Sequence, residues 1–173
     1  IGPLSLPNRL VRSATWDPAI LKSRQMTAEI LDHYRRLAAG GVGLIITGDI
    51  PAMPAGWLDS PAEERPSFSY QAVRIAGYHD LASAVHQTAP ACKIIVQISA
   101  DLYGVGPSAI PSPYSDTSDR PLTEAEIETI INCLVETIAG LQSDGFDGVQ
   151  LHAAHGGLLC RFLSPYTNRR DDG

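Results

Sequence analysis

The sequence lacks several features that would each point to a particular class of protein. No apolar run approaches the roughly 20 residues that a membrane span needs, so we expect no membrane-spanning helix. Lys and Arg number 13 against 19 Asp and Glu, and the net charge of −6 argues against nucleic-acid binding, which needs a basic face. The three cysteines are widely spaced without a CxxC pair, and no signal peptide is evident. We therefore expect reduced thiols and a cytoplasmic protein.

The composition is that of an ordinary globular protein. Hydrophobic residues make up 44% of the chain and charged residues 18%. A length of 173 residues is enough for one domain with a real core. We therefore treat 1–173 as a single domain. Because the chain starts at Ile1 rather than Met, we also expect further sequence to precede it.

Short apolar runs alternate with segments of helical periodicity, which is typical of βα units around a parallel sheet. The expected strands are 10–14, 42–47, 93–98 and 148–152. The expected helices are 27–39, 69–87 and one that begins at Thr123. The two long loops, 48–67 and 99–122, both follow strands, while the helix-to-strand connections are short. This asymmetry puts the elaborated loops at the C-terminal face of the sheet, as in a TIM barrel.

Local signals support the helix limits. Thr27 is a plausible N-cap, and Thr123-x-x-Glu126 has the pattern of a capping box. The helix that follows Thr123 carries an apolar stripe: Ile127, Ile130, Ile131, Leu134, Ile138 and Leu141. Since the stripe recurs at helical spacing, we expect it to pack on the sheet.

The most informative segment is 148–157, where a short apolar strand runs into His152 and His155 and then into Gly156 and Gly157. The C-terminal end of a parallel strand is where such folds keep their active sites, and it presents both histidines near one spot. Two alternatives remain. The histidines can simply satisfy nearby backbone carbonyls, or they can form a metal site with Cys160, since all three are N or S ligands.

Several sequence blocks together resemble a known family. They are 1–4 and 6–15 at the start of the chain, 41–48 (GVGLIITG), 96–99 (VQIS), 106–110 (GPSAI), 144–156 (DGFDGVQLHAAHG) and 162–170 (FLSPYTNRR). These blocks resemble the Old Yellow Enzyme family of FMN-dependent NAD(P)H oxidoreductases, many of which are ene-reductases. The resemblance covers essentially the whole chain but only the first half of the family's eight-stranded barrel. It implies an α/β fold of the (β/α)8 TIM-barrel family, with roughly the first four βα units present.

The resemblance assigns roles to particular residues. Ala14 and Thr15 would lie beside the flavin, with Thr15 bonding its carbonyl edge, and Gln97 would contact the flavin pyrimidine. His152 and His155 would hold the carbonyl oxygen of a small-molecule substrate. Two N–H donors polarise an enone and make its β-carbon a better hydride acceptor. The resemblance thus implies FMN as cofactor and NAD(P)H as reductant.

Two departures from the family pattern matter, and so does the length of the chain. The segment after Gln97, where the family usually carries a His and an Arg, reads Ser99-Ala100-Asp101-Leu102-Tyr103. Gly157 occupies the position where the family usually has a proton-donating Tyr, so the proton must come from elsewhere, with Tyr103 or water as candidates. The resemblance also implies that the flavin phosphate is bound by the last strands of the barrel, which this chain does not include. We therefore expect the 173-residue chain to bind FMN weakly or not at all.

Other functions and partners stay open at this point. The two-histidine site could serve a cofactor-independent isomerase or cyclase acting on a carbonyl-containing natural-product intermediate, or the chain could be a non-catalytic remnant. The cluster Asn168-Arg169-Arg170 is interpreted as solvated or as a loop anchor. Because a half-barrel leaves two strand edges unpaired, we expect a homodimer.

Overall fold

The computed structural model describes residues 2–15, 17, 25–52, 77–100, 102, 104–111 and 118–172. The chain forms two compact units, which are described separately below. The first unit comprises Ile1–Ile50, Arg74–Ile98 and Thr137–Gln150, and the second comprises Pro51–Val73, Ser99–Glu136 and Leu151–Gly173. The expectation of a single domain over 1–173 stays a prediction.

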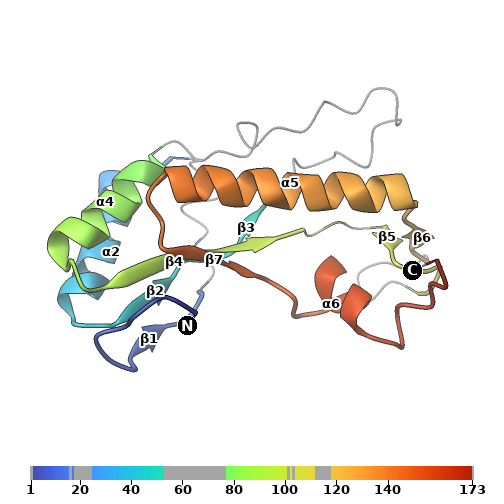
Figure 1. Cartoon of the computed structure of the whole chain (residues 1–173), viewed down its shortest axis with the longest axis horizontal. Helices are drawn as coiled ribbons and strands as arrows, with labels where there is room; N and C mark the ends of the chain where they lie inside the picture. Colours follow the sequence, from blue (N-terminus) through green and yellow to red (C-terminus); the bar gives the residue numbers. More distant parts are fainter. Residues whose placement is uncertain are drawn as a thin grey trace. The chain divides into compact units, whose positions relative to one another are not determined.

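The first unit is built on a parallel sheet. Its strands are β1 (Val11–Arg12), β2 (Leu44–Ile46), β3 (Ile50–Pro51), β4 (Lys93–Ser99) and β7 (Gly148–Leu151). They run in the order β1-β2-β4-β3, with β7 also paired to β4, as Figure 1 shows. The pairs β1–β2 and β2–β4 are parallel, with Ile45 opposite Ile94. Each of the four predicted strands is therefore present, although β1 is only two residues long.

Helices α2 (Ala28–Ala39) and α4 (Tyr78–Thr88) belong to the same unit. Thr27 caps α2 as predicted, because its hydroxyl accepts a hydrogen bond from the Ile30 N–H. Ile30, Tyr34 and Ala38 are buried, and their i, i+4, i+8 spacing gives α2 one buried face. For the helix predicted over 69–87, positions 69–76 lie outside the described residues.

The core of the first unit follows from the alternation of side chains along β4. Ile94, Val96 and Ile98 are fully buried, while the residues between them are half-buried. Leu81 and Val85 of α4 are buried as well. This apolar packing places the end of β4, and with it Gln97, on a rigid element.

The second unit contains shorter elements: β5 (Val105–Gly106), β6 (Arg120–Pro121), α6 (Leu158–Leu163) and the first part of α5 (Glu124–Ser143). β5 and β6 are parallel, with Val105 opposite Arg120. Neither strand was expected, because 99–122 was predicted to be a loop. A two-residue strand that ends in proline has no periodicity from which it could be predicted.

The capping box at the start of α5 is confirmed. The Thr123 N–H donates to Glu126 Oε2 at 2.9 Å, and the Glu126 N–H donates to Thr123 Oγ1 at 3.2 Å. The predicted apolar stripe is correct only in part. Ile130 and Leu134 are buried, but Ile131 is 53% exposed. Val135, one turn further along the helix, is 58% exposed. In the part of the chain that the structure describes, no helix could cross a membrane.

Candidate active site

Polar side chains lie at the ends of three neighbouring strands of the first unit. The Gln97 side-chain N–H donates to Gln150 Oε1 at 2.6 Å, which joins the end of β4 to β7. The buried hydroxyl of Thr47, directly after β2, accepts from the Gln97 backbone N–H at 3.3 Å and donates to the Gly48 carbonyl at 3.0 Å. Gln97 is therefore fixed at both its backbone and its side chain.

Thr15 follows β1, and its hydroxyl is already engaged locally. It accepts from the guanidinium of Arg12 and donates to the Ser13 carbonyl at 3.3 Å. Thr15 is exposed and Ala14 half-buried. A ligand that bonded Thr15 would thus meet a hydroxyl polarised by a neighbouring cation. Nothing in the sequence pattern singles out Arg12.

The backbone after β2 approaches the end of β1 closely. A Cβ on Gly48 would lie 2.6 Å from the Thr15 carbonyl oxygen, so only glycine fits there. Tyr34 of α2 reaches this point, and its hydroxyl is hydrogen-bonded to the Gly48 backbone. Burial raises the pKa of Tyr34 to about 12, against the Gly48 hydrogen bond, which lowers it. Tyr34 therefore carries its proton here throughout the physiological range.

The start of β7 is held by a charged cluster around Asp147. Its carboxylate accepts from His86 Nε2 at 2.8 Å, from Lys93 Nζ at 2.9 Å and from the Ile94 N–H at 2.9 Å. Burial alone would raise the pKa of Asp147, but these donors together outweigh it and lower the pKa below its ordinary value. The cluster fixes the strand that leads to the histidines.

His152 and His155 belong to the second unit, and the structure brings them together. Their ring centroids are 5.0 Å apart, with the planes at 65°. His152 is half-buried and His155 is exposed. His155 has φ of 54°, the only positive value among the described non-glycine residues. A non-glycine residue held in this left-handed region is strained, and such strain gathers at functional sites.

The helix that follows the histidines is anchored by a buried ion pair. Arg161 of α6 bonds Asp119 through Nη1 and donates to the Leu102 carbonyl through Nη2 at 3.0 Å. The side chains are only 5% and 1% exposed, and Asp119 Oδ1 and Arg161 Nε have no partner among the described residues. A Cβ on Gly106 would lie 3.1 Å from Asp119 Oδ2 and 3.2 Å from Arg161 Nη1. A side chain at position 106 would therefore be in tight contact with both members of the pair.

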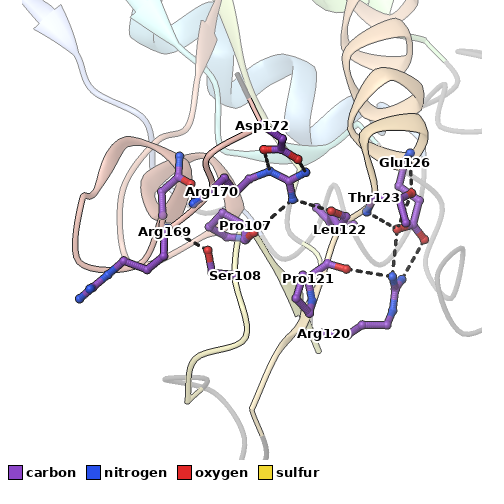
Figure 2. A network of polar contacts seen from close by, with 11 residues as sticks. Pro107, Ser108, Arg120, Pro121, Leu122, Thr123, Glu126, Arg169, Arg170 and Asp172 are labelled. Atoms are coloured by element: carbon purple, nitrogen blue, oxygen red, sulfur yellow. Dashed lines mark hydrogen bonds and ion pairs between the residues drawn. The ribbon is translucent and has the colours of Figure 1, made fainter.

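A second polar network ties the C-terminal loop to the segment before α5, as Figure 2 shows. Arg170 pairs with Asp172 and donates to the carbonyls of Pro107 at 3.2 Å and Leu122 at 2.5 Å. The Asn168 side-chain amide donates to the Phe162 carbonyl at 3.0 Å, and the Arg169 backbone N–H donates to Ser108 Oγ at 2.8 Å. The loop-anchoring interpretation of residues 168–170 is thereby confirmed.

The residues predicted for the flavin and those predicted for the substrate fall in different units. Ala14, Thr15 and Gln97 are in the first, and His152 and His155 are in the second. Their predicted roles stay predictions. Tyr103, the candidate proton donor, lies outside the described residues.

Several side chains around the candidate site have no distinguishing signal in the sequence. Tyr34 belongs to the buried face of a helix, and Gln150 alternates with apolar residues in a strand. Both therefore fit the ordinary periodicity of their elements, which gives no sign of a functional role. Arg161 and Asp119 are 42 positions apart, and their pairing has no local signal. The alternative metal site gains no support, because the described residues contain no group of three or more potential metal ligands.

Known proteins with similar sequences give the family. Residues 1–173 match the NADH:flavin oxidoreductase / NADH oxidase family. An NADH oxidase of Thermoanaerobacter brockii is 34% identical over 99% of this chain, which covers 27% of that protein. An NADH-dependent flavin oxidoreductase of Aspergillus parasiticus is 32% identical over 97% of this chain and is covered to 42%. The chain thus spans less than half the length of these two relatives.

Solved structures give the fold. The chain superimposes on an Old Yellow Enzyme homologue from Zymomonas mobilis with a TM-score of 0.71 at 23% identity, covering 99% of this chain and 51% of that one. Morphinone reductase gives 0.70 at 24% identity, with coverage of 99% and 52%. Both are TIM barrels, so the expected fold class, roughly the first half of such a barrel, is confirmed. By sequence, the chain belongs to the NADH:flavin oxidoreductase / NADH oxidase family.

Proposed function

We propose that the protein is an FMN-dependent oxidoreductase that uses NAD(P)H to reduce an activated alkene, an α,β-unsaturated carbonyl compound. The observation that carries the proposal is the histidine pair at the end of β7, with ring centroids 5.0 Å apart. The family match over residues 1–173 supports flavin chemistry, and the names of the relatives support a nicotinamide reductant. Those names give no support to the cofactor-independent alternative.

The two histidines suit a carbonyl oxygen. Each imidazole can present one N–H, and two donors aimed at one oxygen stabilise the negative charge that develops there when hydride reaches the β-carbon. The α-carbon must then receive a proton. Gly157 has no side chain to supply it, so we assign the donor to Tyr103 or to water. Hydride delivery is the chemistry that bound FMN supplies.

The polar groups of the first unit suit the flavin ring. Its pyrimidine edge alternates carbonyl oxygens with an N–H, and the Gln97 carboxamide offers both a donor and an acceptor. One Gln97 N–H is taken by Gln150, which fixes the amide plane and leaves its oxygen available. The Thr15 hydroxyl accepts from Arg12 and donates to the Ser13 carbonyl, so a flavin carbonyl would replace Ser13 as the acceptor of its hydrogen, next to Ala14 in the chain. We assign flavin binding to Ala14, Thr15 and Gln97 on these grounds.

The experiment measures NADPH oxidation and loss of cyclohex-2-enone with FMN added in excess, because we expect the 173-residue chain to bind FMN weakly. We expect His152→Ala and His155→Ala each to lower enone turnover about 10²–10³-fold without changing FMN content. His33→Ala, at an exposed histidine of α2, is the matched control and should keep wild-type turnover. Wild-type turnover in both test variants would disprove the site. NADPH oxidation without enone loss would keep the flavin oxidoreductase and reject the alkene substrate.

Gly157→Tyr tests the proton donor. A phenol at this position should raise enone turnover in the flavin-loaded protein, because it adds a side-chain acid next to the histidine pair. Unchanged turnover in Gly157→Tyr would show that protonation does not limit the rate. Gly157→Phe, which has the same ring without the hydroxyl, is the control.

We also propose that the protein is a homodimer that acts in the cytoplasm. Among the described residues β1 is the outermost strand of its sheet, and Leu10 and Val11 are 62% and 46% exposed. Exposed strand edges with apolar side chains pair readily with another chain. Light scattering should give twice the chain mass at micromolar concentration, and Val11→Pro should give a monomer. A stable wild-type monomer would refute the dimer.

A further inference from the structure

We propose that Arg161 is a positioning residue for the histidine pair. Its buried side chain joins α6 to Asp119 and to the Leu102 carbonyl, and α6 in turn holds the turn that carries His155. Because this role deepens the account of the same site, it rests on the proposed function. All of the groups involved lie within the second unit.

The turn that carries His155 has a demanding backbone conformation. The Gly157 N–H donates to the Ala154 carbonyl at 3.0 Å, which closes a four-residue turn with His155 and Gly156 at its centre. Both central residues have positive φ, 54° at His155 and 74° at Gly156. A residue with a Cβ is strained at such a position and keeps the conformation only where the surrounding structure enforces it. The histidine turn therefore needs support from outside itself.

Hydrogen bonds connect this turn directly to Arg161. The Arg161 N–H donates to the Gly157 carbonyl at 3.0 Å, and the Arg161 carbonyl accepts from the Thr167 hydroxyl at 2.6 Å. The guanidinium pairs with Asp119 and donates to the Leu102 carbonyl at 3.0 Å. Arg161 is thus bonded through its backbone and its side chain. The turn that ends at Gly157 cannot shift without disturbing these bonds.

The chemistry of the buried pair suits positioning better than stability. Leu158 and Arg161 are three positions apart on the buried face of α6, where an apolar side chain would be ordinary. Removing two charges from water costs free energy that their mutual attraction seldom exceeds by much, so a buried pair is a weak source of stability. A guanidinium instead supplies a planar fork with donors in fixed directions. Asp119 and the Leu102 carbonyl are the two acceptors of this fork.

Exact placement matters for the proposed reaction because two N–H donors must reach one carbonyl oxygen. The ring centroids of His152 and His155 are 5.0 Å apart, which leaves room for both rings to face one small group. A displacement of about 1 Å, caused by a change away from the reacting atoms, can lower a rate about 10²-fold. Loss of the Arg161 fork should therefore lower turnover although both histidines are still present.

The first variant is Arg161→Lys, which keeps the charge beside Asp119 but replaces the fork by a single ammonium group. With FMN in excess, we expect turnover of cyclohex-2-enone to fall about tenfold or more. Hydrogen exchange of the Gly157 N–H should speed up about as much, relative to the amide of Ile130 in the same unit. The nuclear Overhauser contact between the ring protons of His152 and His155 should weaken. Unchanged exchange at Gly157 would overturn the proposal.

Arg120→Lys is the matched control. The Arg120 fork also bonds a carboxylate of the second unit, Glu126, at 3.0 and 2.8 Å, but it reaches α5 rather than α6. This variant should keep wild-type enone turnover, Gly157 exchange and ring contact. Equal changes in Arg120→Lys and Arg161→Lys would show a general loosening of the unit and overturn the proposal.

A double variant separates positioning from stability. Asp119→Leu combined with Arg161→Met replaces the pair by apolar side chains and should recover the free energy of unfolding that Arg161→Met alone loses. Since Met has no directed donors, we expect enone turnover to stay about tenfold or more below wild type. Recovery of turnover together with stability would show that the pair is only structural and overturn the proposal. If the double variant does not fold, the comparison of Arg161→Lys with Arg120→Lys decides.

Failure of the proposed reaction is distinguishable from failure of this role. A wild-type chain that does not reduce the enone rejects the alkene substrate, whereas Gly157 exchange and the ring contact still decide whether Arg161 holds the histidine turn. Wild-type enone turnover with unchanged Gly157 exchange in Arg161→Lys keeps the reaction and rejects the positioning role.

Discussion

Different kinds of interaction stabilise the interiors of the two units of this protein. The first unit is built on a parallel sheet, in which Ile94, Val96 and Ile98 are fully buried. In the second, the regular strands are two residues long, and polar side chains connect the loops. Asp119 and Arg161, both buried, are the central example. The comparison indicates that a regular apolar alternation supports the first unit, whereas in the second a buried ion pair accompanies an apolar core that includes Leu122 and Leu158.

The largest effect should come from breaking the buried pair of the second unit. Arg161→Met leaves the Asp119 carboxylate buried without its cation, and we expect a loss of about 3–5 kcal/mol in the free energy of unfolding. Urea denaturation measures this. Arg36→Met is the matched control, since Arg36 and Asp32 are paired on the surface at 70% and 56% exposure, and it should cost less than about 0.5 kcal/mol. Equal losses would show that the buried pair does not hold the second unit.

Gly48→Ala tests how closely the backbone segments that follow β1 and β2 approach each other in the first unit. The added Cβ would lie 2.6 Å from the Thr15 carbonyl oxygen, so the ends of β1 and β2 must separate, at a cost of about 2–3 kcal/mol. Gly148→Ala is the control within the same sheet, because its Cβ would meet only Ile95 Cγ2 at 3.4 Å. Thermal unfolding compares the two variants. A Gly48→Ala protein as stable as Gly148→Ala would contradict the close approach.

High pH should weaken the first unit through Tyr34. The pKa of Tyr34 in the folded protein is about 12 rather than 10.0, so between these values the unfolded chain loses a proton that the folded chain keeps. Stability therefore falls as pH rises from 10 to 12, by about 2 kcal/mol for this group. Tyr34→Phe should show a correspondingly smaller fall in urea denaturation over that range. Parallel pH profiles for Tyr34→Phe and wild type would rule out the shift.

The smallest difference concerns the two helix caps. Thr123→Ala removes one half of a reciprocal capping box and should cost about 1 kcal/mol. Thr27→Ala removes a single bond of 3.4 Å and should cost about half as much. Hydrogen exchange in the first turns of α5 and α2 measures both. If Thr27→Ala loosens α2 more than Thr123→Ala loosens α5, the comparison of the caps is reversed.

What the sequence could predict follows from the range of the interactions. The strands over 42–47 and 93–98 and the caps at Thr27 and Thr123 depend on neighbours within a few residues, and all four are found. The approach of His152 to His155 was likewise expected, because three positions separate them.

The failures are equally physical. β5 and β6 are too short to leave a periodic pattern, and the Asp119–Arg161 pair joins residues 42 positions apart. Ile131 fits the apolar stripe of α5 by spacing, but the stripe is wider than the face that the protein buries. The flavin contact of Thr15 stays a prediction, but the local hydrogen bonds of its hydroxyl with Arg12 and Ser13 had no signal in the sequence. The sequence shows which side chain stands at a position, whereas the hydrogen-bond and ion-pair partners of that side chain depend on the assembled fold.

The buried pair also has a consequence for how this sequence can change over evolutionary time. A neutral residue in place of Arg161 would leave Asp119 as an uncompensated charge, and a side chain at position 106 would lie in tight contact with both. Each single replacement is a step toward lower stability, whereas joint replacement by apolar residues restores it. Positions 106, 119 and 161 should therefore be inherited as one set, kept together or exchanged together as the sequence diverges.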